Sequence, residues 1–119
     1  MKYLMFIKHK ELDHAQTPPP ALMAAMEGFV GRMFDSGMLK ETGGLKPVRE
    51  SVRIRSAKGA LQVLDGPYAE SKEVVGGYAI VEVSSHEQAL AIATEFMELH
   101  RQHWPEFECE SEVRLIEGA

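Results

Sequence analysis

The chain has 119 residues, of which 45% are hydrophobic and 26% charged, and its formal net charge is −5. This composition is typical of one globular domain, residues 1–119, and excludes disordered and collagen-like proteins. The negative charge argues against direct binding to nucleic acid, and no apolar run approaches the roughly 18 residues of a membrane-spanning helix. The single cysteine, Cys109, excludes an internal disulfide, so we expect a cytoplasmic protein.

Hydrophobic periodicity divides the chain into alternating strands and helices. In chain order, the expected elements are a strand at 2–9, a helix beginning at Pro18 and ending at Gly37, an extended connection at 38–50, strands at 51–56 and 61–64, an ordered loop at 65–77, a strand at 78–83, a helix beginning at Ser84 and ending before Pro105, and a strand at 107–116. We interpret the apolar opening as this first strand rather than as a secretory signal, because it lacks a longer apolar core.

Short-range signals mark where several of these elements begin and end. Thr17 is expected to cap the first helix, and Ser84 with Glu87 forms a capping-box pattern at the start of the second. The pair Lys58-Gly59 predicts a hairpin turn, because glycine tolerates a positive φ.

The order of the elements predicts an α+β fold, a ferredoxin-like split βαβ sandwich. Such a sandwich covers one sheet face with helices and leaves the other bare. The strands at 2–9 and 78–83 are apolar on both faces, so the bare face also needs cover. We expect a homodimer in which two sheets pack face to face, forming a dimeric α/β barrel.

The segment at residues 65–78, DGPYAESKEVVGGY, is the most unusual part of the sequence. It places two acids, a base, a hydroxyl and an aromatic ring between two strands, and sites often lie on loops held by a rigid sheet. A tight turn with solvated charges explains the same residues, since Asp-Gly and Gly-Pro are common turn dipeptides.

This segment closely resembles the signature of the YCII-related, DGPF-domain family. The opening MKYLMFIK, the loop around Gly43-Gly44 and the ending HWPEFECESEVRLIE resemble other parts of that family. The resemblance implies a ferredoxin-like fold assembled as a dimeric barrel, a pocket between helices and sheet, and a His–Asp pair at the active site. It also implies an association with sigma factors of the extracytoplasmic-function type. The positions that match the signature are Asp65, Gly66, Pro67, Glu70, Lys72, Gly77 and Tyr78, with Tyr68 where the family usually has phenylalanine.

The family's histidine has four candidates here by position, His9, His14, His100 and His103, and the helical pattern favours His100. It continues the apolar stripe of the second helix, so we expect it to be partly buried, with Asp65 tuning it as a general base. A histidine that only caps the helix C-terminus is the structural alternative. His103 could share the same face as a substrate-binding residue, or the two rings could hold a metal with Glu106 or Asp65.

Three hypotheses about function follow. The first is a small enzyme-like protein without a tightly held cofactor, in which Asp65 and His100 transfer a proton on a small, partly apolar molecule. In this hypothesis Tyr68, Glu70, Lys72 and His103 bind the substrate. The second is a non-catalytic module that binds a ligand or a partner, linked to sigma-factor regulation. The third is a purely structural dimer, because a fold does not by itself determine a function.

Overall fold

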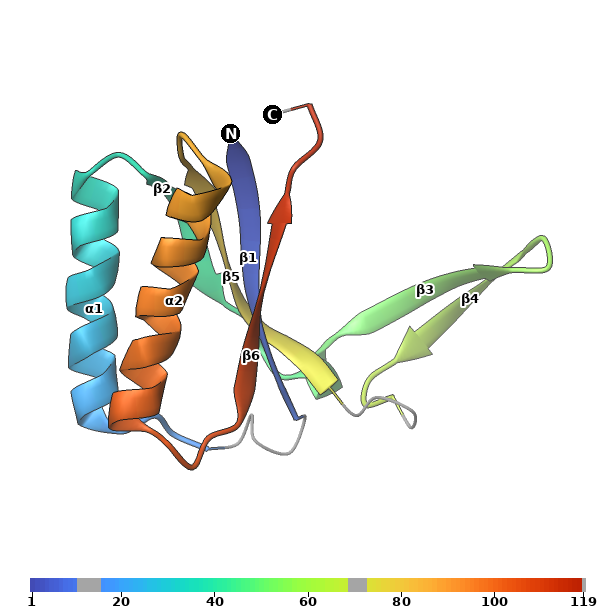
Figure 1. The fold of residues 1–119 in the computed structure, drawn as a ribbon. Helices are drawn as coiled ribbons and strands as arrows, with labels where there is room; N and C mark the ends of the chain where they lie inside the picture. The colour runs from blue at the N-terminus through green and yellow to red at the C-terminus, as the bar shows by residue number, and fades with distance from the viewer. Residues whose placement is uncertain (11–15, 69–72, 119) are drawn as a thin grey trace.

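The computed structural model describes residues 1–10, 16–68 and 73–118. The described residues form two α-helices and six strands, with a short 3₁₀ turn at Val48–Glu50 (Figure 1). The elements are β1 (Lys2–Lys10), α1 (Pro20–Asp35), β2 (Leu39–Gly44), β3 (Val52–Ala57), β4 (Ala60–Asp65), β5 (Glu73–Glu82), α2 (His86–His103) and β6 (Cys109–Leu115).

Four strands form one antiparallel sheet in the order β2-β5-β1-β6. The two strands that begin each half of the chain, β1 and β5, lie at the centre, and the strand that follows each helix lies at an edge. This is the ferredoxin-like α+β arrangement that the sequence predicts. Both central strands are apolar on two faces, which fits their place inside the sheet.

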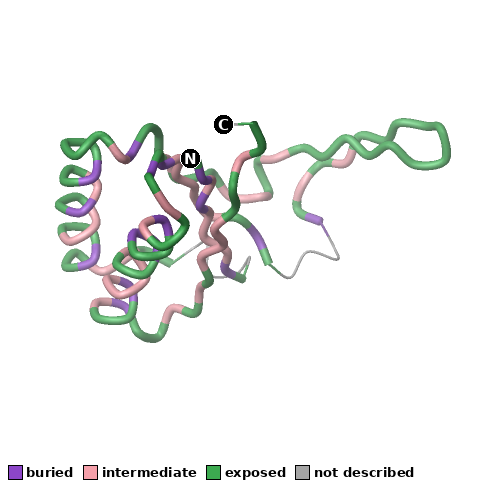
Figure 2. Tube along the Cα trace, turned by 45° about the horizontal axis from the view of Figure 1, so that its top comes forward, coloured by how far each residue is buried: buried purple, intermediate pink, exposed green. Residues whose placement is uncertain are grey.

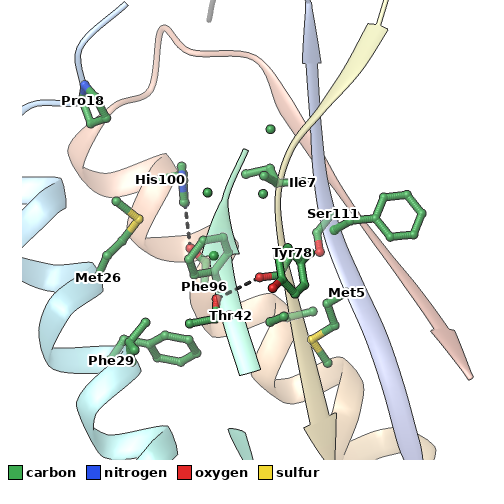
Figure 3. Close-up of a pocket in the computed structure, with 18 of the residues that line it drawn as sticks. Met5, Ile7, Pro18, Met26, Phe29, Thr42, Tyr78, Phe96, His100 and Ser111 are labelled. Carbon is green, nitrogen blue, oxygen red and sulfur yellow. Dashed lines mark hydrogen bonds between the residues drawn. The ribbon is translucent and has the colours of Figure 1, made fainter. Parts of the chain in front are cut away.

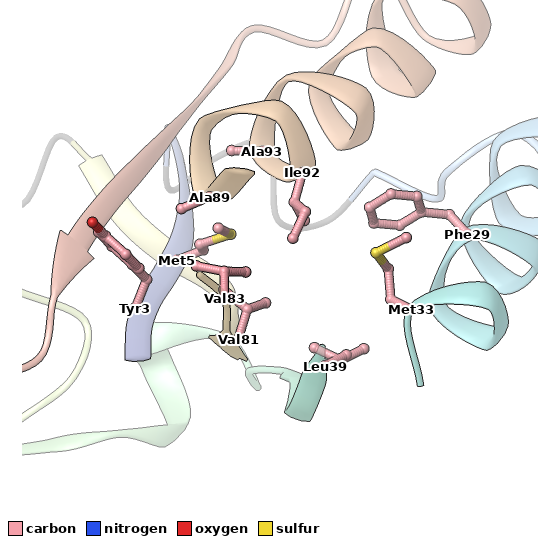
Figure 4. Packing of buried hydrophobic residues seen from close by; sticks show 10 residues of the cluster. All are labelled: Tyr3, Met5, Phe29, Met33, Leu39, Val81, Val83, Ala89, Ile92 and Ala93. Atoms are coloured by element: carbon pink, nitrogen blue, oxygen red, sulfur yellow. The ribbon is translucent and has the colours of Figure 1, made fainter. Parts of the chain in front are cut away.

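Both helices cover the same face of this sheet, and the hydrophobic core lies between these two layers (Figure 4). Tyr3 and Met5 of β1 pair with Val81 and Ala79 of β5, so these side chains share the helix-facing side. Ten buried residues make up the core: Tyr3, Met5, Phe29, Met33, Leu39, Val81, Val83, Ala89, Ile92 and Ala93.

The helix ends differ from the sequence prediction in detail. The N-cap of α1 is Pro19, with no side-chain hydrogen bond, so the prediction of a Thr17 cap is wrong. The N-cap of α2 is Ser85, one residue later than predicted, and its hydroxyl accepts from the backbone of Gln88 at 3.1 Å. Gly37 follows α1 with a φ of +82°, which confirms its role at the helix end.

Strand β2 was interpreted from the sequence as a connection, and that interpretation is wrong. In β2 only Leu39 is buried, and of the remaining residues, KETGG, all but Thr42 have low strand propensity. The strand forms because β5 offers its edge, with Thr42 opposite Ala79. Strand β5 also begins earlier than expected, at Glu73, and pairs with β1 as far as Lys10.

The hairpin of β3 and β4 forms a separate two-stranded sheet, with a turn at Lys58 and Gly59 as predicted. It projects from the side of the main sheet opposite to the helices (Figure 1), and nearly all of it is exposed (Figure 2). The radius of gyration is 16.0 Å, whereas a compact chain of this length has about 13.5 Å. The hairpin therefore lies outside the body of the domain.

The second face of the main sheet is also apolar at its centre. Leu4 and Phe6 of β1 pair with Ile80 and Tyr78 of β5, and all four side chains are half-buried. They lie on the side away from the helices, because neighbouring residues alternate along a strand. No helix among the described residues is long and apolar enough to cross a membrane.

Candidate ligand-binding site

A cavity of about 570 Å³ lies between the helices and the sheet (Figure 3). Its size falls within the range of small-molecule sites in proteins. Residues of both helices and of the main sheet line it. The described lining contains no Lys, Arg, Asp or Glu, and its only titratable nitrogens are those of two histidines, His9 and His100. The cavity is therefore suited to an apolar ligand.

The helical stripes of the sequence place the apolar walls. Met26, Phe29 and Met33 follow one another at spacings of three and four on α1, and Phe96 and His100 do so on α2. The rings of Phe29 and Phe96 lie 5.9 Å apart across the two helices. Methionine side chains are flexible and polarizable, so this wall can adapt to ligands of different shape.

His100, a site residue predicted from the sequence, is buried and lines the cavity. Its side chain is 7% exposed, and its Nδ1 lies 3.0 Å from the carbonyl oxygen of Phe96, one turn earlier in α2. Burial lowers the pKa of His100 from 6.5, although the carbonyl of Phe96 acts in the opposite direction. The ring is therefore neutral at pH 7, as a proton acceptor must be.

A second histidine, His9 at the end of β1, also lines the cavity and is 6% exposed. Its Nδ1 lies 2.7 Å from the carbonyl oxygen of Lys10. Its Nε2 packs so closely on Gly76 that a Cβ there would lie 2.5 Å from it. The sequence contained a signal for this position, because alternation places His9 on the same face of β1 as Met5.

Two aromatic residues after α2, Trp104 and Phe107, also line the cavity. Trp104 and Phe107 stack with ring centroids 4.1 Å apart and an interplanar angle of 6°, and Phe107 lies 5.6 Å from the ring of His9. Sequence patterns assign neither residue to a site. Both residues come after the last turn of α2, next to Pro105. The turn between α2 and β6 therefore determines where their side chains point.

The structure does not bring Asp65 to His100 within one copy of the chain. Asp65 is exposed at the end of β4, opposite Val52 in the hairpin, whereas His100 lines the cavity. Within one chain, the predicted pair of Asp65 and His100 therefore does not form.

Tyr68 has a structural place at the base of the hairpin. It is buried, its hydroxyl lies 2.9 Å from that of Ser51, and the Arg53 guanidinium lies 3.6 Å from its ring centroid. Next to it, a Cβ on Gly66 would overlap the carbonyl oxygen of Val48. This part of the signature segment holds the hairpin base together, which agrees with the tight-turn interpretation.

The remaining predicted site residues are Glu70, Lys72 and His103. Glu70 and Lys72 lie outside the residues that the structure describes, so their roles stay predictions. His103 is half-buried at the end of α2 and is not part of the described lining. Among the described residues, no three His, Cys, Asp or Glu side chains are grouped closely enough to hold a metal ion, so His100 and His103 lack a third ligand there.

Comparisons with known proteins identify relatives but no activity. The model of the YCII-related domain matches residues 1–97. An uncharacterized protein of Rhizobium meliloti (strain 1021), R00369, is 31% identical over 72 residues. That match spans 60% of this chain and 58% of the relative, so somewhat over half of each protein is compared.

Proposed function

The chain belongs to the YCII-related domain family, and we propose that it binds a small, mostly apolar molecule in the cavity between its helices and its sheet. The observation that carries the proposal is the cavity itself: about 570 Å³, walled by apolar side chains, with the buried ring of His100 inside. Apolar walls of this extent are stabilised when an apolar ligand removes them from contact with water.

In this proposal His100 is the group that can take part in chemistry. Its ring is neutral at pH 7 because burial lowers its pKa, so it can accept a hydrogen bond or a proton from the bound molecule. The proposal gives no role to Asp65 of the same copy, which lies in the exposed hairpin. Proton transfer is therefore the reaction class that the site supports best, should binding lead to turnover.

The binding step can be tested with 2-naphthol as a probe, using isothermal titration calorimetry. Met26 lines the cavity, and in Figure 3 its side chain extends from α1 toward His100, so Met26→Trp fills the space that the probe would occupy. Leu90→Trp is the matched control, because Leu90 is exposed on α2 and is not part of the described lining. We expect Met26→Trp to weaken binding at least tenfold and Leu90→Trp to leave it unchanged. Equal binding by both variants would place the probe elsewhere.

We also propose that two copies of the chain form a homodimer. Two apolar surfaces lie on the side of the sheet away from the helices: the sheet centre around Phe6 and Ile80, and the hairpin face. Val52, Ile54, Leu61 and Val63 share that hairpin face, each 57–74% exposed. A two-stranded hairpin is marginally stable alone in water, and a second copy against the sheet would cover both surfaces at once.

The cellular setting and the regulatory partner complete the proposal. A cytoplasmic location suits Cys109, which the structure leaves as a free thiol and whose pKa is raised by burial. Association with a sigma factor stays a prediction, which a pull-down with the purified protein would check.

A further inference from the structure

The hydrogen-bonding state of His100 determines which polar group a ligand must bring into the cavity. From it we infer that the ligand is an uncharged molecule with a flat apolar body and one hydrogen-bond donor, directed at Nε2 of His100. This inference rests on the proposed function, because it concerns the occupant of the same cavity.

The contact between His100 and the carbonyl of Phe96 determines the tautomer of the imidazole ring. A carbonyl oxygen can only accept a hydrogen bond, so the 3.0 Å contact with Phe96 requires the hydrogen on Nδ1 of His100. A neutral ring carries one such hydrogen, and Nε2 is then left with a lone pair. Burial of the ring favours this neutral form. The cavity therefore presents a fixed acceptor at Nε2.

The described residues leave the Nε2 acceptor of His100 without a hydrogen-bond donor. Within the described part of the chain, no donor lies within hydrogen-bond reach of Nε2, although the side chain is only 7% exposed. Nε2 lies at the end of the ring furthest from the helix backbone, and the ring borders the cavity. A buried acceptor without a partner loses its hydration without compensation. A hydroxyl or N–H group on the ligand restores the missing bond.

The described lining disfavours charged ligands. The described lining contains no Lys, Arg, Asp or Glu side chain, so a carboxylate or phosphate would lose its hydration without meeting a cation. The hydroxyls of Thr42 and Ser111 are neutral, and that of Thr42 donates to the carbonyl oxygen of Tyr78 at 2.8 Å. His9 directs its Nδ1 at the carbonyl oxygen of Lys10. Neither hydroxyl can replace the positive charge of a lysine or an arginine.

The shape of the cavity supports a flat ligand. Aromatic rings form much of the wall near His100: Phe96 lies 4.7 Å from the His100 ring, and Trp104 stacks on Phe107. Aromatic faces pack well against another flat ring, in stacked or tilted arrangements. A ring system that bears one hydroxyl would satisfy both the walls and the acceptor.

Three probes of similar size and shape test this inference by calorimetry at pH 7: 2-naphthol, 2-methoxynaphthalene and 2-naphthoate. The first donates a hydrogen bond, the second cannot donate, and the third is an anion. We expect 2-naphthol to bind at least about tenfold more tightly than 2-methoxynaphthalene, and 2-naphthoate to bind most weakly. Equal binding of the first two, or tightest binding of 2-naphthoate, would overturn the inference and leave the proposed function standing. Binding by none of the three would overturn both.

Variants at position 100 connect the selectivity to the ring nitrogen. His100→Phe keeps a flat ring but removes the acceptor, so 2-naphthol should lose its advantage over 2-methoxynaphthalene. His100→Gln restores an acceptor oxygen and should recover part of that advantage. His103→Phe is the matched control on the same helix, away from the described lining, and should bind like the original protein. If His100→Phe still binds 2-naphthol more tightly than 2-methoxynaphthalene, the inference is overturned. The comparison of the three probes on the unaltered protein remains a test even if a variant fails to fold.

Discussion

Placing a charge on the apolar face of the hairpin should break the proposed homodimer. Ile54 is 69% exposed and lies opposite Val63 on that face. Full burial of such a side chain stabilises by about 1.5–3 kcal/mol, so covering the exposed part contributes about 1–2 kcal/mol per copy. A symmetric dimer contains this contact twice, so Ile54→Asp should raise the dissociation constant by about 30- to 1000-fold. Sedimentation velocity over a concentration series measures the change.

The control for this experiment lies on the other face of the same hairpin. Gln62 pairs with Arg55 rather than with Ile54, and it is exposed, so Gln62→Asp adds the same charge away from the apolar face. We expect this variant to dimerise like the original protein. The reasoning is refuted if the two variants sediment alike, or if the original protein remains a monomer at all concentrations.

Three further predictions concern stability and can be measured by urea denaturation. Gly66→Ala should destabilise the fold by about 1–3 kcal/mol, because the added Cβ would overlap the backbone of Val48. Gly28→Ala should stabilise the fold by about 0.5–1 kcal/mol, because Gly28 lies in a helix with open space around it. The opposite order of stabilities would contradict this account. Tyr68→Phe should cost about 0.5–1.5 kcal/mol through loss of its hydroxyl contact, and no change would show that the contact is idle. Burial lowers the pKa of His100, so below about pH 6.5 the unfolded state takes up its proton first, and stability should fall as the pH drops. This component should be absent in His100→Phe, and an unchanged pH dependence in that variant would contradict it.

The elements that the sequence predicts well are those with strong periodicity. The stripe on α2 that includes Ile92 and Phe96 predicts a helix with one buried face, and it correctly extends burial to His100. The turn at Lys58-Gly59 follows from glycine's tolerance of a positive φ, which is +77° at Gly59. Both features depend on interactions within one turn of chain, so local patterns contain the information.

Features that depend on partners distant in sequence were beyond the reach of such patterns. Strand β2 has few residues that favour a strand, and it exists because the edge of β5 pairs with it. Asp65 and His100 each belong to a plausible site, but their separation depends on the hairpin leaving the main sheet. Trp104 lines the cavity only through the turn that follows α2, and no periodic pattern covers that turn.

The methionine methyl groups provide the most direct test of a ligand in the cavity. Of the seven methionines, those that line it are Met5, Met23, Met26 and Met33, and those outside the described lining are Met1, Met38 and Met97. With the methyl groups labelled with ¹³C, a titration with 2-naphthol should shift resonances of the first group and show contacts from them to the probe. The second group should stay nearly unchanged. Shifts confined to the second group, or no shifts up to the solubility limit of the probe, would contradict the central claim that this cavity binds a small apolar molecule.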